Sequence, residues 1–171
     1  MSSFQNPLAR WNSRFAEPGY LFGEAPNAYL IEANQWLRPG LSLMVADGEG
    51  RNSVWLAKQG HQVEGFDFSE IAVEKAKALA AREQVTVTWD VCGWQDFAWQ
   101  TERYDNVIGI FFQFASPEER SLLFRKMDAA LKPGGKMLIQ GYTAKQLEFK
   151  TGGPGILEHL YDEALDRKSV V

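Results

Sequence analysis

Two glycines and one acidic residue are spaced as in a site that binds a nucleotide. Gly48 and Gly50 follow a short apolar run, and Asp67 comes seventeen positions after Gly50. Glycine has no Cβ, so a turn here can approach a ligand closely, and the helix that follows offers unpaired N–H groups. A carboxylate about 20 residues further on can accept hydrogen bonds from both hydroxyls of a ribose. The spacing predicts a nucleotide site; the alternative is a plain turn with an acid that caps a loop.

The elements that must position these residues are a strand, a turn, a helix and a second strand. Residues 43–46 form an apolar run that predicts a buried strand, and residues 52–59 have the pattern of a helix that ends at Gly60. Residues 62–66 alternate as a second strand, and Asp67 stands at its tip. This order is the first βαβ half of a nucleotide-binding sheet.

The chain then continues to alternate helices with strands. Ser69 predicts the start of a helix, and Ser116 with Pro117 predicts another that continues to the turn at 133–135. Strands are expected at residues 85–89, 104–112 and 137–139. Strands that alternate with helices form a parallel sheet with right-handed crossovers, and ligands bind beyond its carboxyl ends. The fold class predicted is α/β, a three-layer, doubly wound, mostly parallel sheet.

Two helices are expected before the first strand. Asn6 and Pro7 predict the start of the first, and the second carries Leu30, Ala33 and Leu37 on one face. The segment between them is rich in aromatic residues and is interrupted at residues 18–19. We expect residues 11–27 to form a mobile lid over the mouth of the sheet; the alternative is an extension that covers the sheet edge.

Composition excludes several classes of function. The net charge is −4 and the basic residues are scattered, which argues against a nucleic-acid partner. There is no apolar run of about 18 residues and no pattern of a secretory signal, so we expect no membrane partner and a cytoplasmic protein. The single cysteine, Cys92, excludes an internal disulfide, and the two histidines lack the spacing of metal ligands.

These motifs together resemble the class I S-adenosylmethionine-dependent methyltransferases, and within them the small bacterial tellurite-resistance and thiopurine-methyltransferase type. The resemblance rests on the glycine loop at 48–53, Asp67, the pair Asp90–Val91 and the turn at 131–135. Residues 11–14 and 20–27 are similar to the family's N-terminal lid, so the resemblance extends from about residue 11 to residue 155. It implies a Rossmann-like methyltransferase fold and S-adenosyl-L-methionine as cofactor.

The resemblance also implies which residues form the site. Asp67 corresponds to the acid that binds the ribose, and Asp90 with Val91 to the pair that contacts adenine. Predicted cofactor-binding residues are Arg14, Ala46, Asp47, Gly48, Glu49, Gly50, Asn52, Asp67, Phe68, Asp90, Val91, Cys92 and Phe111. Predicted substrate-pocket residues are Trp11, Tyr20, Phe22, Phe112 and Gln113. Cys92 is expected to act through its backbone; no catalytic residue is assigned, and no metal is expected.

The glycine loop departs from the family pattern at two positions. Met44 stands where the family has an acid, and Ala46 stands at the first glycine, with an acid displaced to Asp47. Ala46 must therefore tolerate the backbone angles of the turn. Asp47, Glu49 or a backbone carbonyl near Phe111 would have to orient the ammonium group of the cofactor.

The expected function is methyl transfer to a small molecule. The fourth strand ends in Phe111-Phe112-Gln113-Phe114, which offers no strong general base, so a soft nucleophile such as a thiol or chalcogen is the expected acceptor. One alternative is a non-catalytic paralogue that binds an adenosyl cofactor. A second is a nicotinamide-dependent oxidoreductase, because Gly48-x-Gly50-x-x-Ser53 is one residue short of the dinucleotide fingerprint.

The C-terminal part of the chain is short for this family, whose sheet gains two further strands. Only 29 residues follow Tyr142, whereas a helix, two strands and their connections need roughly 33 to 40 residues. We therefore expect five parallel strands without the last strand pair, and a helix at residues 156–167. The edge at 137–140 would be exposed, which predicts a homodimer, a cover made by that helix, or a truncated product of marginal stability.

The whole chain is predicted to form one methyltransferase-like domain, residues 1–171. We divide it into an N-terminal helical lid at 1–40, a cofactor-binding sheet core at 41–142 and a shortened C-terminal segment at 143–171.

Overall fold

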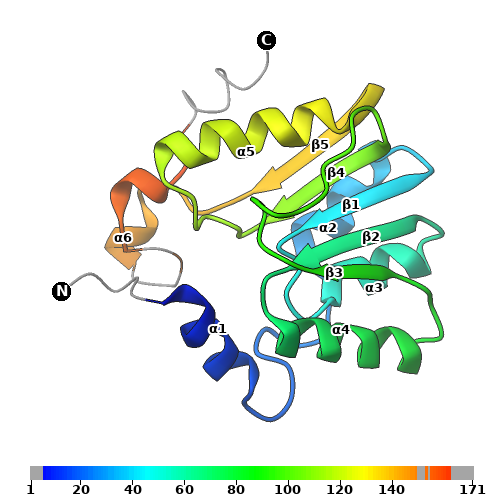
Figure 1. Cartoon of the computed structure of the whole chain (residues 1–171), viewed down its shortest axis with the longest axis horizontal. Helices are drawn as coiled ribbons and strands as arrows, with labels where there is room; N and C mark the ends of the chain where they lie inside the picture. The colour runs from blue at the N-terminus through cyan, green and yellow to red at the C-terminus, as the bar shows by residue number, and fades with distance from the viewer. Residues whose placement is uncertain (1–5, 150–152, 154, 163–171) are drawn as a thin grey trace.

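The computed structural model describes residues 6–149, 153 and 155–162. Its centre is a parallel sheet of five strands in the order β3-β2-β1-β4-β5 (Figure 1). The strands are β1 (Leu41–Val45), β2 (Gln62–Asp67), β3 (Thr88–Val91), β4 (Tyr104–Ile110) and β5 (Leu131–Gln140). The predictions of an α/β fold and of five parallel strands are confirmed for this part of the chain. The strand order reverses between β1 and β4, which is where ligands bind in sheets of this kind.

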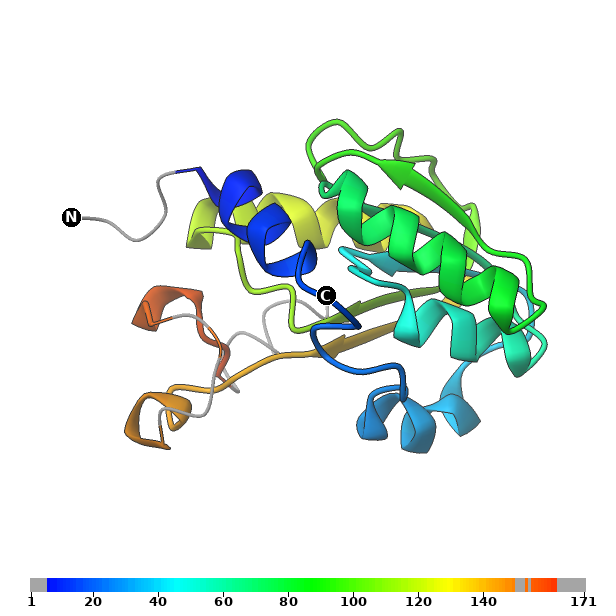
Figure 2. The same ribbon diagram turned by 90° about the horizontal axis from the view of Figure 1, so that it is seen from below.

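Helices cover both faces of the sheet. They are α1 (Pro7–Phe15), α2 (Ala28–Ala33), α3 (Arg51–Lys58), α4 (Glu70–Arg82), α5 (Pro117–Ala129) and α6 (Gln146–Phe149), with 3-10 turns η1 (Asn34–Trp36) and η2 (Leu157–His159). Figure 2 shows α5 on one side of the sheet and α2 and α3 on the other. Leu123 and Met127 of α5 pack on one face, and Leu30 of α2 and Leu56 of α3 pack on the other.

The helix starts follow the predicted capping residues. The side chain of Asn6 accepts from the N–H of Ala9, and that of Ser69 accepts from the N–H of Ala72. Ser116 and Glu119 form the predicted capping box at the start of α5. Each cap satisfies backbone N–H groups that the first helical turn leaves without partners.

The third strand was predicted at residues 85–89 but begins three residues later, at Thr88. Gln84 adopts φ +57°, and the N–H of Val85 donates to the carbonyl of Ala80 at 3.1 Å. These are features of a Schellman cap on α4. Val85 therefore closes the helix rather than pairing in the sheet, although its apolar pattern is typical of a strand.

Two other predicted helices end earlier than expected. The second helix was predicted to include Leu37, but α2 ends at Ala33 and a 3-10 turn follows. The helix before the turn at 133–135 ends at Ala129, and residues 131–135 already belong to β5, with an irregular register between Tyr104 and Asn106 of β4. In the second case the chain enters β5 directly after the helix.

The prediction of a helix at residues 156–167 is wrong for residues 156–162, the part of this range that the structure describes. Residues 157–159 form a 3-10 turn, and Tyr161 then pairs with Thr143 in a parallel bridge. The N–H of Tyr161 donates to the carbonyl of Tyr142 at 2.9 Å, which holds the chain extended there. Residues 163–171 lie outside the described part. In the described sheet β5 pairs only with β4, and the homodimer stays a prediction.

The N-terminal helix lies at the carboxyl end of the sheet. In Figure 1, α1 and α6 lie at the end toward which the strand arrows point, with α1 beside α4. Among the described helices, none is long and apolar enough to span a membrane.

Candidate functional site

The turn after β1 has the backbone that its glycines predict. Gly48 and Gly50 have φ +62° and +80°, in the left-handed region, and Gly50 is the N-cap of α3. Ala46 also adopts a positive φ, +51°, as its place at the first glycine of the motif requires. The left-handed conformation costs a residue with a Cβ about 1 to 2 kcal/mol. The turn is therefore formed, with local strain at Ala46.

The two glycines serve different purposes. A Cβ on Gly50 would lie 2.6 Å from the Cβ of Ala76 and 3.2 Å from the ring of Trp89, so Gly50 permits α3 to pack on α4 and β3. A Cβ on Gly48 would meet only the ring of Phe15, at 3.7 Å. The ring of Phe15 thus lies over Gly48, and a ligand that approaches the backbone there must take the place of this ring.

Asp67 lies at the tip of β2, beside Gly48. Its Oδ2 accepts from the N–H of Gly48 and its Oδ1 from the N–H of Ser69, both at 2.9 Å. The residue is 5% exposed, and burial raises the pKa of its carboxyl to about 6, with a smaller contribution from Asp47. A carboxylate can accept about four hydrogen bonds, so Asp67 retains acceptor capacity beyond these two bonds.

Asp47 points beneath the loop instead of toward its outer surface. Its Oδ2 accepts from the hydroxyl of Ser53 at 2.5 Å and from the indole N–H of Trp89 at 2.8 Å. Its Oδ1 is buried and has no hydrogen-bond partner among the described residues. Burial raises the pKa of the Asp47 carboxyl. Asp47 is therefore a buried acceptor that joins the loop to β3.

Glu49 and Asn52, both predicted to bind the cofactor, instead hold the N-terminal segment. Glu49 accepts from the N–H of Leu21 at 2.7 Å and forms an ion pair with Lys75 at 3.0 Å. Asn52 accepts from the N–H of Asn27 at 2.9 Å. Both are buried, with 5% and 7% exposure. These side-chain oxygens bind groups of the protein, and the roles of the two residues in cofactor binding stay predictions.

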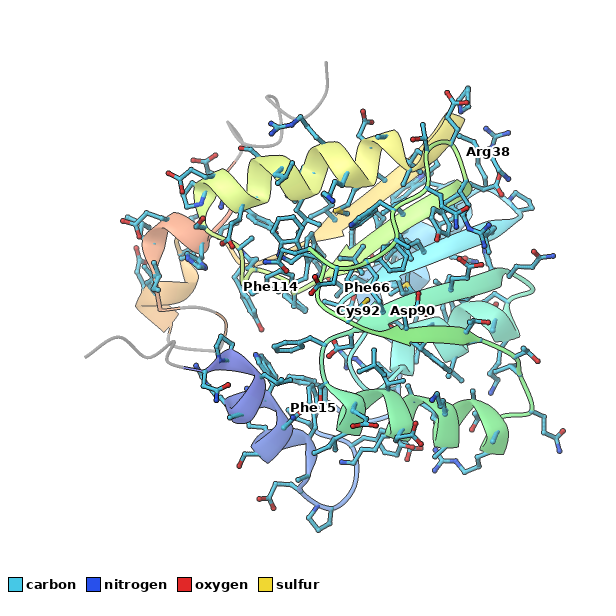
Figure 3. The ribbon with its side chains drawn as sticks, in the orientation of Figure 1. Phe15, Arg38, Phe66, Asp90, Cys92 and Phe114 are labelled. Atoms are coloured by element: carbon cyan, nitrogen blue, oxygen red, sulfur yellow. The ribbon has the colours of Figure 1, made fainter. Side chains whose placement is uncertain are left out.

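The tip of β3 is open to solvent. Asp90 is exposed, and 47% of the surface of Val91 is exposed. Figure 3 shows Asp90 and Cys92 at the end of the sheet away from Arg38. The N–H of either Val91 or Cys92 was expected to donate to the adenine ring. The N–H of Cys92 donates to the carbonyl of Asp67 at 3.0 Å, which leaves that of Val91 as the expected donor. Burial raises the pKa of the Cys92 thiol.

The other predicted cofactor residues lie on α1 and just after β2 and β4, at the carboxyl end of the sheet; we call the surface between them and the tip of β3 the opening. The guanidinium of Arg14 lies over the ring of Trp11 at 4.7 Å and over that of Phe22 at 5.8 Å. Phe111 has φ +55°, is 39% exposed and stacks on Tyr142 at 4.5 Å. Phe68 is half-buried next to Asp67.

The predicted substrate residues fall into two groups. Trp11, Tyr20 and Phe22 lie on the N-terminal segment beside the loop, and Phe22 is 51% exposed. Phe112 is 3% exposed within the core that includes α5. Gln113, at 6% exposure, donates to the carbonyls of Tyr142 and His159 at 2.8 and 3.0 Å. The structure thus places Phe112 and Gln113 in structural contacts, which corrects their assignment to a pocket.

A family model described as a methyltransferase domain matches residues 43–135, which is more than half of the chain. The chain belongs to this methyltransferase-domain family. It is similar to probable thiol methyltransferase 2 of Arabidopsis thaliana, with 27% identity over 129 residues that cover 74% of this chain and 55% of that protein. The chain thus spans about half the length of this curated relative.

Solved structures show the same fold as this methyltransferase domain. A structure concerned with the conversion of a disulfide bond into a thioacetal group during echinomycin biosynthesis has a TM-score of 0.73 at 19% identity, covering 86% of this chain and 67% of that one. A TehB-like SAM-dependent methyltransferase from Corynebacterium glutamicum has a TM-score of 0.61 at 23% identity, covering 94% and 77%. At these identities the likeness concerns the fold, which is that of the class I methyltransferases.

The residues of the methyltransferase domain fit an adenosyl cofactor in two respects. Only the side chain of Phe15 lies over the backbone of Gly48, and Asp67 has acceptor capacity at the tip of β2. Asp67, Gly48 and the tip of β3 lie together, since the carbonyl of Asp67 binds the N–H of Cys92.

Sequence reasoning missed three residues that build this site. Ser53 and Trp89 hold Asp47, and Lys75 holds Glu49. One signal was available, because a tryptophan with a polar indole N–H in a short strand needs a partner when it is buried. Lys75, in the middle of a predicted amphipathic helix, gives no such signal.

Proposed function

We propose that this methyltransferase domain binds S-adenosylmethionine and transfers its methyl group to a small molecule through a soft nucleophile such as a thiol or chalcogen. The observation that carries the proposal is the hydrogen bond between Gly48 and Asp67, beside the point where the strand order reverses. It joins a glycine turn to an acid at the next strand tip within the residues that match the family.

Each part of the opening has a role in this proposal. Asp67 would hold the ribose, and Asp90 with the exposed Val91 would bind the adenine. Arg14, on the N-terminal helix, would meet the carboxylate of the cofactor. S-adenosylmethionine supplies a methyl group already activated by its sulfonium charge, so the protein chiefly positions the reactants and excludes water.

The proposed acceptor class follows from what faces the opening. The tip of β4 presents the partly exposed ring of Phe111, and the N-terminal segment presents Phe22. These aromatic surfaces can exclude water but cannot remove a proton. A nucleophile that is already anionic or polarisable at neutral pH needs no general base, and the relative named as a probable thiol methyltransferase supports this class.

A non-catalytic paralogue that binds an adenosyl cofactor is the second candidate. Met44, at the family's acidic position, is buried at 1% exposure, and Asp47 points beneath the loop. Glu49 is paired with Lys75. Two of the three groups from which we expected a contact to the cofactor's ammonium, Asp47 and Glu49, are thus engaged elsewhere, which favours weak binding or lost turnover.

Two measurements test the proposal. Isothermal titration with S-adenosylhomocysteine, S-adenosylmethionine and NAD should show saturable binding of the first two and none of NAD. A methyl-transfer assay should then show turnover with small thiols and not with their alcohol analogues. Binding without turnover on any soft nucleophile would support the paralogue, and binding of NAD alone would contradict both candidates.

A further inference from the structure

Lys75 of α4 joins the glycine loop to the N-terminal segment. Its ammonium lies 2.8 Å from the carbonyl oxygen of Glu17, 2.7 Å from that of Gly19 and 3.0 Å from Oε1 of Glu49. A lysine ammonium has three N–H donors, so these three acceptors use them all. The side chain of Glu49 is 4% exposed and that of Lys75 is 23% exposed. This is the most buried ion pair among the described residues.

The contacts around Lys75 bring three segments together. Oε2 of Glu49 accepts from the N–H of Leu21 at 2.7 Å, and the hydroxyl of Tyr20 donates to the carbonyl of Lys75 at 3.1 Å. Residues 17–21, the glycine loop and α4 are therefore fastened at one point. Lys77, two residues later on the same helix, is exposed and pairs with Glu74 at 2.8 Å.

The position of α1 depends on this fastened segment. The helix ends at Phe15, whose ring lies over Gly48, and Glu17 follows two residues later. Farther along α1, the hydroxyl of Ser69 donates to Oδ1 of Asn12 at 2.5 Å. Gly19 adopts φ +79°, and a Cβ there would meet nothing within 4 Å. Residues 17–21 are thus anchored to α4 and the glycine loop. The helix α1, which precedes them in the chain, lies over the proposed cofactor site.

We propose that Lys75 is a positioning residue for this site. It acts through Glu49 and through the carbonyls of Glu17 and Gly19, and does not touch the cofactor. Through these contacts it determines how closely Phe15 of α1 lies over Gly48, and it keeps the carboxylate of Glu49 turned toward α4. This refines the predicted lid at 11–27. Residues 17–21 are held by the contacts of Lys75 and Glu49, so we expect the movement of the lid to be in α1, where it must break the bond between Ser69 and Asn12. The inference rests on the proposed function only where it concerns cofactor binding; the anchoring of residues 17–21 by Lys75 is independent of it.

The test compares Lys75→Met with Lys77→Met as the matched control. Lys75→Met keeps an unbranched side chain one heavy atom shorter than lysine and removes the donors. Loss of a charge-assisted contact should weaken binding of S-adenosylhomocysteine by about tenfold. Hydrogen exchange at the amide of Leu21 should rise in the free protein. Lys77→Met should match the parent in both measurements.

A double-mutant cycle separates positioning through Glu49 from a general loss of stability. Because Lys75 and Glu49 act as one unit, Lys75→Met with Glu49→Gln should bind no worse than the weaker single variant. Should Lys75→Met fail to fold, Lys75→Gln and Glu49→Gln replace it, with the same expected weakening.

Two results overturn the inference: affinity and Leu21 exchange like those of the parent in the Lys75 variant, or losses that add fully in the cycle. If the parent itself does not bind S-adenosylhomocysteine, the proposed function fails. Hydrogen exchange in the free protein then still decides whether Lys75 anchors residues 17–21.

Discussion

The two sides of the opening at the carboxyl end of the sheet are built differently. On the side of the glycine loop, Glu49 and Asn52 are buried, and both they and the partly buried Asp47 are bonded to other parts of the protein. On the side of the strand tips, Asp90 and Phe111 are exposed. The glycine loop can therefore contact a ligand mainly through its backbone. The strand tips can contact it through exposed side chains. Asp67 belongs to both, because it binds the loop and retains acceptor capacity.

Removing Asp67 should have the largest effect on binding. In Asp67→Ala the N–H groups of Gly48 and Ser69 lose their acceptor, and the ribose loses its own. A lost charge-assisted acceptor is worth roughly 1.5 to 3 kcal/mol, which is about ten- to a hundredfold in affinity for S-adenosylhomocysteine. Isothermal titration measures this, with Asp67→Asn as a variant that keeps one acceptor oxygen. Parent-like affinity in Asp67→Ala would show that the acid only caps the loop.

The burial of Asp67 should also appear as a pH dependence of stability. Its carboxyl has a pKa of about 6 when folded, above its ordinary value of 3.8, because burial disfavours the charge. The folded state then binds more protons than the unfolded state between these values, so the free energy of unfolding falls as pH rises from about 4 through 6. Burial acts on the pKa of Asp47 in the same direction.

Urea unfolding between pH 4 and 7 measures this dependence, with an expected decrease of the order of 2 kcal/mol in the parent. Asp67→Asn should reduce the slope, since it removes one of the two titrating carboxyls. A free energy of unfolding that rises through this window would contradict the burial of both groups.

A smaller effect on binding is expected at the tip of β3. There Asp90 would contact the ligand through its side chain, whereas Cys92 uses its backbone N–H to bind Asp67. Asp90→Ala should weaken binding of S-adenosylhomocysteine several-fold, as loss of one solvent-exposed hydrogen bond costs about 0.5 to 1.5 kcal/mol. Cys92→Ala should leave affinity nearly unchanged, because the substitution keeps the backbone N–H of Cys92, which is bonded to the carbonyl of Asp67. The reverse order of effects would move the adenine away from Asp90.

The smallest effect concerns the strain at Ala46. Ala46→Gly should raise the free energy of unfolding by about 0.5 to 1 kcal/mol, because glycine adopts φ +51° at little cost. Urea unfolding tests this against Ala78→Gly, an exposed site inside α4, where glycine should destabilise by about 1 kcal/mol. Equal destabilisation by both substitutions would mean that the turn carries no strain at Ala46.

The strand tips and the glycine turn could be predicted from sequence because both depend on local patterns. Gly48, Gly50 and Asp67 lie within one βαβ unit, and the spacing of that unit determines where they meet. The directions of Glu49 and Asn52 could not be predicted in this way. Their partners, Leu21, Lys75 and Asn27, are 25 to 28 positions away in sequence.

The tip of β4 shows a second limit. A strand that is buried on both faces is apolar throughout and lacks the alternation that tells one face from the other. Phe111 and Phe112 therefore look alike in sequence, but one is partly exposed at the opening and the other is in the core. Val85 shows a third limit, because it has the pattern of a strand but caps a helix.

A crystal structure with S-adenosylhomocysteine tests the central claim most directly. We expect the ribose hydroxyls within hydrogen-bond distance of Asp67, the adenine beside Asp90 and Val91, and the ligand backbone against Gly48. The Glu49–Lys75 ion pair should remain, and α1 should be the segment whose position differs. A ligand bound with Asp67 still capped only by Gly48 and Ser69, or one bound away from this end of the sheet, would contradict the account.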